Sequence, residues 1–157
     1  MTDAMAPSLQ ERYAPQNKCF GCGAANEKGL RIRSYEEGDG LVAHWQPEVQ
    51  HEAYAGMLSG GIIGTLLDCH SNWAAAIHLM RKAAQDKLPC TVTARLEVRY
   101  LRPTPTKDGV VLKARVTEAG DGRATVEATL EAGGQVTASS RATFVSVREG
   151  HPAWNRW

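Results

Sequence analysis

Hydrophobic and polar positions change their period twice along the chain. In residues 1–28, prolines and glycines are mixed with polar residues without any period, and this predicts an irregular arm. Residues 29–45 alternate between apolar and polar positions around a Glu-Glu-Gly-Asp-Gly stretch at 36–40, which predicts a β-hairpin. After Pro47 and a linker at residues 51–56, the spacing of apolar residues becomes helical.

The helical pattern extends from about Gly60 to Lys82. Its apolar residues recur at helical spacing and form one broad stripe, Ile63, Leu66, Leu67, His70, Ala74 and Ile77. A second line consists of small residues and a single acid, Gly60, Gly64, Asp68, Ser71 and Ala75. Because small side chains allow close approach, we expect another element to pack against this second line.

From Pro89 onward the period falls to two, which is typical of strands. In the first run we expect one face to hold Val92, Ala94, Leu96, Val98 and Tyr100, and the other to hold Thr93, Arg95, Glu97 and Arg99. Three more alternating runs follow, separated by Asp108-Gly109, Gly120-Asp121-Gly122 and Gly133-Gly134. These runs predict a four-strand meander.

Together the elements predict an α+β fold in a single domain. A chain of 157 residues with 43% hydrophobic content is large enough for one core. One helix cannot cover both faces of a sheet, so an antiparallel sheet of about five or six strands should wrap around the long central helix and keep its outer face polar. We divide the chain into an arm at 1–28, a folded domain at 29–149 and a tail at 150–157.

Charge and hydropathy exclude several function classes. Eighteen basic and 17 acidic residues are scattered along the chain, and the net charge of +1 argues against nucleic-acid binding. The first residues lack the apolar segment of a targeting sequence. The stretch from Met57 to Met80 is long enough to span a membrane, but its polar residues favour a buried helix. We therefore expect a cytoplasmic protein with neither a nucleic acid nor a membrane as partner.

Four cysteines, Cys19, Cys22, Cys69 and Cys90, are too few for a disulfide scaffold and are expected to be free thiols or metal ligands. Cys19-Phe-Gly-Cys22 has the spacing of half a zinc site, but no second pair completes it. We expect Cys69 and His70, in the buried helix, to be out of reach. For Cys19 and Cys22 we rank three roles: structural packing first, a zinc ion shared between arms second and redox chemistry third. We assign no metal ligand.

The start of the long helix and one acid within it carry the candidate chemistry. Ser59-Gly60-Gly61 offers unhindered backbone N–H groups at the positive end of the helix dipole, so it is a candidate oxyanion hole; the alternative is an ordinary cap. Asp68 is costly to bury and needs either a partner or a function. Its alternative role is a structural hydrogen bond to Asn72 or to a strand hydroxyl.

These residues form a pattern that resembles a known family. The run from His51 through Gly56-Met57-Leu58-Ser59-Gly60-Gly61 to Leu66-Leu67-Asp68, followed by Arg99-Tyr100-Leu101-Arg102-Pro103, resembles the hotdog-fold acyl-CoA thioesterases of the PaaI-like branch, over about residues 29–147. The head of the chain, Cys19-Phe20-Gly21-Cys22-Gly23 with Asn26, Gly29 and Leu30, resembles one subset of them. The resemblance implies a hotdog domain at 29–149 that hydrolyses acyl-CoA without a cofactor, as a homodimer or a dimer of dimers.

The resemblance also implies roles for three residues. Asp68 would act as general base or nucleophile, the Gly60 N–H would polarise the thioester carbonyl, and Thr93 would assist the attacking water. The chain departs from the family at two positions, because Ser59 stands where the family often has His and Ala53 where it often has Asn. His51 is a candidate replacement for the missing polar group, and its alternative is a solvated loop residue.

The remaining candidates concern substrate binding, which we assign to His51, Ser59, Gly61, Trp73 and Arg102. Arg102 would meet the phosphates of CoA, unless it belongs only to a solvated strand face. Trp73 would line an acyl pocket, unless it is core. The competing function is a non-catalytic acyl-CoA-binding or regulatory hotdog protein. A hotdog dehydratase ranks lower, since the pattern contains no convincing catalytic His with a nearby acid.

Helix geometry predicts how the two principal residues are combined. Eight residues separate Gly60 from Asp68, which places their backbones roughly 12 Å apart along the axis. One thioester carbon cannot reach both within a chain. If they serve one site, they come from different chains, and this predicts a two-fold dimer with two composite sites.

Overall fold

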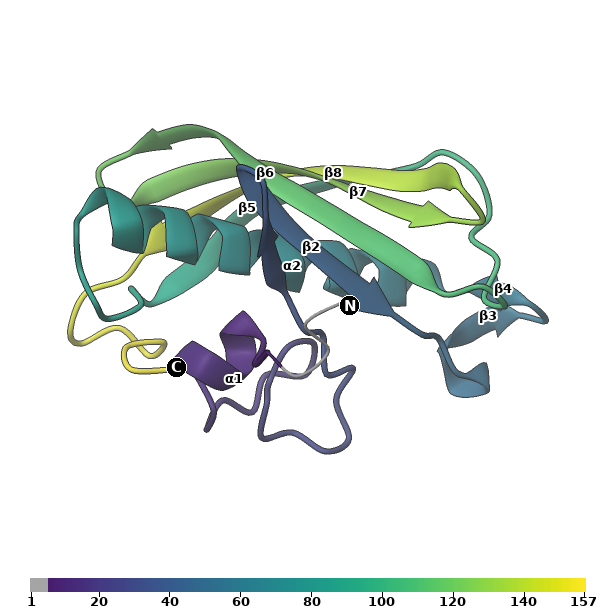
Figure 1. Ribbon diagram of the computed structural model, residues 1–157, viewed down its shortest axis with the longest axis horizontal. Coiled ribbons are helices and arrows are strands. Elements are labelled where there is room, and N and C mark those ends of the chain that lie inside the picture. The colour runs from purple at the N-terminus through teal and green to yellow at the C-terminus, as the bar shows by residue number, and fades with distance from the viewer. Residues whose placement is uncertain (1–5) are drawn as a thin grey trace.

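A curved antiparallel sheet lies over one long helix in the computed structural model, which describes residues 6–157 (Figure 1). The helices are α1 (Leu9–Tyr13) and α2 (Gly60–Lys82), with a 3-10 turn η1 (Val49–His51). The strands are β1 (Tyr35–Glu37), β2 (Gly40–Trp45), β3 (Glu52–Tyr54), β4 (Met57–Leu58), β5 (Thr91–Tyr100), β6 (Val110–Gly120), β7 (Arg123–Ala132) and β8 (Gln135–Ser146). The predicted α+β hotdog architecture is confirmed, and α2 has the predicted bounds.

The main sheet has the strand order β1-β2-β6-β7-β8-β5, and each neighbouring pair is antiparallel. The predicted four-strand meander is therefore correct only for β6, β7 and β8. Helix α2 contacts β2, β5, β6, β7 and β8, so the chain crosses beneath the sheet before β5 joins the edge opposite β1. β3 and β4 form a separate two-stranded sheet within the segment for which the sequence predicts a linker.

A β-bulge at Ala94 changes the predicted alternation of β5. Thr93 pairs with Phe144 of β8, and Tyr100 pairs with Ala138. Both of these partners are fully buried. Since directly paired residues share a face, Thr93 and Tyr100 both face α2. The expectation that they lie on opposite faces is wrong, because a strict alternation of faces does not allow for the extra residue that the bulge inserts.

The predicted first strand also begins later than its alternation indicates. Residues 30–34 are not a strand, although Leu30 and Ile32 are buried. Their backbone N–H groups donate to the carbonyl oxygens of Phe20, at 2.9 Å, and Gly21, at 3.1 Å. The N-terminal arm thus takes the hydrogen bonds that a strand partner would have used, and pairing starts only at Tyr35.

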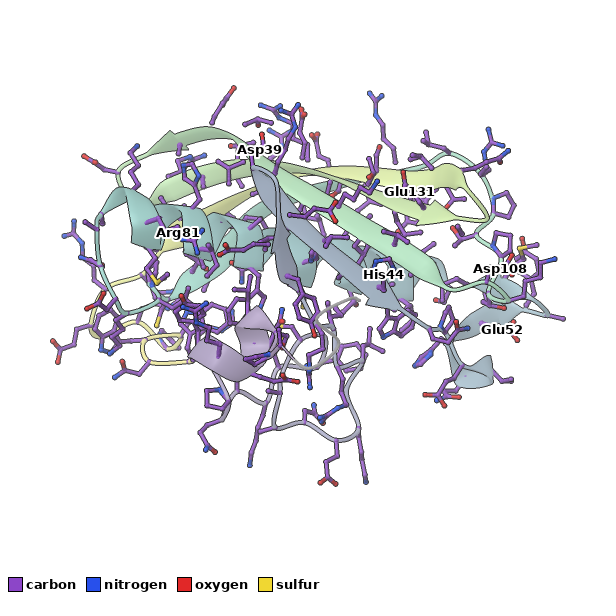
Figure 2. The ribbon with its side chains drawn as sticks, viewed as in Figure 1. Asp39, His44, Glu52, Arg81, Asp108 and Glu131 are labelled. Atoms are coloured by element: carbon purple, nitrogen blue, oxygen red, sulfur yellow. The ribbon has the colours of Figure 1, made fainter. Side chains whose placement is uncertain are left out.

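The two faces of the sheet differ as expected. The inner face packs on α2 around fully buried side chains such as Leu112, Leu130 and Phe144. The outer face carries charged groups, among them Glu131, which is labelled in Figure 2 and is paired with Lys113 at 3.5 Å. No helix within residues 6–157 is both long enough and apolar enough to cross a membrane.

The N-terminal arm and the C-terminal tail cover α2 on the side away from the sheet (Figure 1). The Asn17 side chain donates to the backbone carbonyl of Arg156 at 2.6 Å, which joins the arm to the tail. The Trp157 ring lies 4.8 Å from the ring of Trp73 on α2. Residues from both ends of the chain therefore complete the core around the helix.

Candidate active site

The helix begins where the sequence predicts. Ser59 is the N-cap residue, and its N–H donates to the His51 carbonyl at 2.9 Å. The Ser59 side chain makes no capping hydrogen bond, and the first N–H groups of a helix have no acceptor within it. Gly61 is exposed. The helix therefore presents backbone donors, reinforced by its dipole, to an approaching acceptor.

Tyr100 of β5 packs against this helix start. Its hydroxyl donates to the Gly60 carbonyl at 2.7 Å. A Cβ atom added to Gly60 would lie 3.5 Å from the tyrosine ring, and one added to Gly64 would lie 3.8 Å from its hydroxyl. The ring thus contacts the line of small residues along α2. The expected close approach of another element to that line is confirmed, and the element is β5.

Asp68 lies farther along the same face of α2, half-buried beside β5. Its Oδ1 accepts a hydrogen bond from the Thr93 hydroxyl at 2.8 Å. Burial raises the pKa of Asp68 above its usual value, while the Thr93 hydrogen bond lowers it. The nearby charge of Cys19 also raises the pKa, and that of Arg156 lowers it. One carboxylate oxygen is held by the protein, and the other can accept a hydrogen bond from water.

The structure brings only some of the predicted site residues together. Asp68 and Thr93 are in direct contact. Ser59, Gly60 and Gly61 lie two turns away at the helix start, near the end of the molecule where Figure 2 labels Glu52 and Asp108 and opposite the labelled Arg81.

Three predicted substrate-binding residues have other partners within the chain. The His51 Nδ1 accepts from the Glu48 N–H at 2.9 Å, and its ring lies 4.9 Å from that of Trp45. Trp73 is 1% exposed and lies in the core. The guanidinium of Arg102 donates to Gln135 at 2.6 Å on the exposed surface just after β5.

Sequence reasoning missed a contact between the arm and α2. The sulfur atoms of Cys19 and Cys69 are 3.8 Å apart, and those of Cys19, Cys22 and Cys69 all lie within 4.8 Å of one another. The expectation that Cys69 is out of reach is wrong, because the irregular arm folds directly onto α2. The glycine at position 21 is a usable signal, since only a residue without a side chain allows this approach.

His70 does lie apart from the cysteines, as expected. Its Nε2 donates to the Leu41 carbonyl at 3.2 Å, because a carbonyl oxygen can only accept. Its Nδ1 therefore accepts from the Ser34 hydroxyl at 2.8 Å. The side-chain amide of Gln10 donates in turn to Ser34 at 3.0 Å. These bonds join the arm, α2 and β2 in one buried chain and leave both nitrogens of His70 engaged.

Comparison with known proteins places this geometry in a family. Residues 55–139, more than half of the chain, match the family model described as Thioesterase superfamily. The chain belongs to the thioesterase superfamily. A thioesterase superfamily protein from Shewanella loihica PV-4 is 31% identical, with a TM-score of 0.65, over 74% of this chain and 91% of that one.

Two more distant structures share the fold of this thioesterase superfamily member. A Bacillus halodurans protein solved with CoA is 22% identical, with a TM-score of 0.63, over 76% of each chain. A thioesterase from Thermus thermophilus, complexed with coenzyme A and Zn, is 19% identical, with a TM-score of 0.58, over 75% of this chain and 86% of that one. No curated protein sequence is significantly similar to the chain.

Proposed function

We propose that the protein is an acyl-CoA thioesterase that hydrolyses the thioester to a free acid and CoA. The observation that carries the proposal is the hydrogen bond from Thr93 to Asp68, which orients a half-buried carboxylate on α2. Superfamily membership and the CoA bound to a structural relative support the substrate class. We place the chain in the PaaI-like branch, and its free cysteines suit the reducing cytoplasm.

The chemistry is acyl transfer to water. Asp68 takes a proton from the attacking water, a contribution of about 10²- to 10⁴-fold, or attacks the carbonyl itself. The Gly60 N–H stabilises the negative charge that develops on the thioester oxygen, worth about 10²- to 10³-fold. Thr93 holds the carboxylate in position and favours its ionised form, which opposes the effect of burial.

The site is composite in this proposal, because Asp68 and Gly60 lie too far apart on one helix. β5 is an edge strand of the sheet, and its residues from Thr93 to Arg95 are exposed. Along β5, Thr93 lies beside Asp68 and Tyr100 lies beside Gly60. Antiparallel pairing of two β5 edges about a two-fold axis near residues 96–97 would bring Asp68 of one protomer level with Gly60 of its partner.

Release of free thiol from a panel of acyl-CoAs, measured for the wild type and Asp68→Asn, tests the proposal. We expect turnover of at least one acyl-CoA by the wild type and loss of that turnover in the variant. Tight acyl-CoA binding without hydrolysis would instead support a non-catalytic binding or regulatory protein. Turnover that does not depend on Asp68 would contradict the assigned mechanism.

A further inference from the structure

We propose that Cys19, Cys22 and Cys69 form a zinc site that fastens the N-terminal arm to α2. The three sulfur atoms lie within 4.8 Å of one another, and those of Cys19 and Cys69 are 3.8 Å apart. Two thiolates bound to one tetrahedral zinc, each at about 2.3 Å, are roughly 3.8 Å apart. The cluster therefore has nearly the spacing of three zinc ligands before any ion is added.

Two glycines shape the turn that brings the sulfurs together. A Cβ atom on Gly21 would lie 2.4 Å from the Cys69 sulfur, so a side chain at this position would separate the turn from α2. A Cβ atom on Gly23 would lie 2.4 Å from the backbone nitrogen of Cys19. Hydrogen bonds from the Cys22 and Cys69 side chains lower the pKa of the Cys19 thiol, and the backbone N–H groups of Cys22 and Gly21 add to this effect. The turn thus presents backbone donors to the Cys19 sulfur and brings it close to Cys69.

Trp73 places a buried hydrogen-bond donor beside the cysteines. The side chain is 1% exposed, and its indole Nε1 is buried without a hydrogen-bond partner within residues 6–157. Cys19 and burial raise the pKa of Cys22, and the indole of Trp73 lies close enough to that thiol to oppose them. A buried N–H needs an acceptor, and a metal-bound thiolate at Cys22 would provide one.

Zinc is the ion that this donor set favours. Thiolate ligands select soft or borderline metals, and a tetrahedral sulfur arrangement is typical of zinc. A tetrahedral zinc with three cysteine ligands would have a fourth coordination position. Cys22 and Cys69 are buried, whereas Cys19 is half-buried, so water would reach this position from the side of Cys19. Cys19 and burial raise the pKa of Cys22 to about 11. Cys19, Cys22 and burial raise the pKa of Cys69 well above its usual value. Because a cysteine bound to zinc is a thiolate, zinc binding to this cluster would release protons.

Metal analysis of the purified full-length protein, together with single cysteine variants, tests the site. We expect one zinc ion per wild-type chain and loss of zinc in Cys19→Ser, Cys22→Ser and Cys69→Ser. Cys90→Ser is the matched control, because Cys90 is also buried but accepts a hydrogen bond from the Asn155 N–H at 3.2 Å outside the cluster. Trp73→Phe should retain the ligands and weaken zinc binding about tenfold.

The wild type alone gives a second measurement that does not depend on the folding of variants. After removal of metal by a chelator under reducing conditions, cobalt should restore thiolate-to-metal absorption bands, and zinc should displace the cobalt. Zinc should also protect Cys19, Cys22 and Cys69 from alkylation while leaving the labelling of Cys90 unchanged. Equal labelling with and without zinc, absence of cobalt bands, or full zinc content in a folded Cys69→Ser protein would overturn the proposal.

Discussion

Asp68 and His70 are two residues apart on the same helix and show how burial can lead to different roles. Burial disfavours the charged form of both, so it raises the pKa of Asp68 and lowers that of His70 to about 4. His70 is completely buried, and both ring nitrogens are engaged with Ser34 and Leu41. Asp68 is half-buried, and its observed partner, Thr93, holds one oxygen. A perturbed pKa becomes useful for chemistry only where a substrate can reach the group.

The comparison predicts that loss of the Asp68 charge harms activity more than stability. Asp68→Asn preserves the size of the side chain but removes its ability to accept a proton, so turnover should fall by about 10²-fold or more. Acyl-CoA hydrolysis and thermal unfolding, measured on the same preparation, check this. If turnover falls less than about tenfold in a folded variant, Asp68 has a structural role like that of His70.

His70 should show the opposite behaviour, with an effect on stability. Its pKa is about 4 in the folded protein against an ordinary value of 6.5, so the unfolded chain binds the proton first as the pH falls. The contribution of neutral His70 to the free energy of unfolding is complete above about pH 6.5. It is lost as the pH drops toward 4, by on the order of 3 kcal/mol. Denaturant unfolding of the wild type and His70→Asn across this range measures the difference. An equally steep pH dependence in the variant would assign the loss to other groups.

Thr93 should affect turnover less than Asp68 does, because it acts through the carboxylate. Thr93→Val keeps the shape of the side chain and removes one hydrogen bond to a charged group, so turnover should fall about tenfold. The apparent pKa in the pH profile of kcat/KM should rise, since the lost bond favours ionised Asp68. Thr93→Ser is the control that keeps the hydroxyl. A lower melting temperature with unchanged turnover per folded molecule would show a purely structural role.

Mixed dimers test whether Asp68 of one chain and Gly60 of another form one site. Unfolded Asp68→Asn and Gly60→Pro chains are mixed and refolded; proline removes the N–H and is tolerated in the first helical turn. Random pairing makes about half of the dimers mixed, each with one intact site, so activity should recover to roughly a quarter of the wild type. Activity no greater than the average of the two refolded variants would show that the residues do not combine across chains.

Local chemistry is sufficient to predict most of the fold. The apolar stripe fixes α2, since a period of 3.6 residues has one buried face, and Ser59 with two glycines marks where the helix begins. The hairpin turns follow from glycines that adopt positive φ angles, such as Gly133 and Gly134 between β7 and β8. Asp68 stands out in the sequence because an acid in a mostly apolar helix needs a compensating partner.

Tertiary contacts decide what these residues meet. The bulge at Ala94 turns Thr93 toward Asp68, and no pattern of alternating residues contains that shift of register. The place of β5 beside β8 depends on the path of α2 beneath the sheet, and this path depends on contacts between segments distant in the sequence. Cys69 meets the Cys19–Cys22 turn because the arm packs on α2 across 50 positions of sequence. The sequence specifies periods and partners nearby along the chain, whereas contacts between distant segments depend on how all the elements pack together.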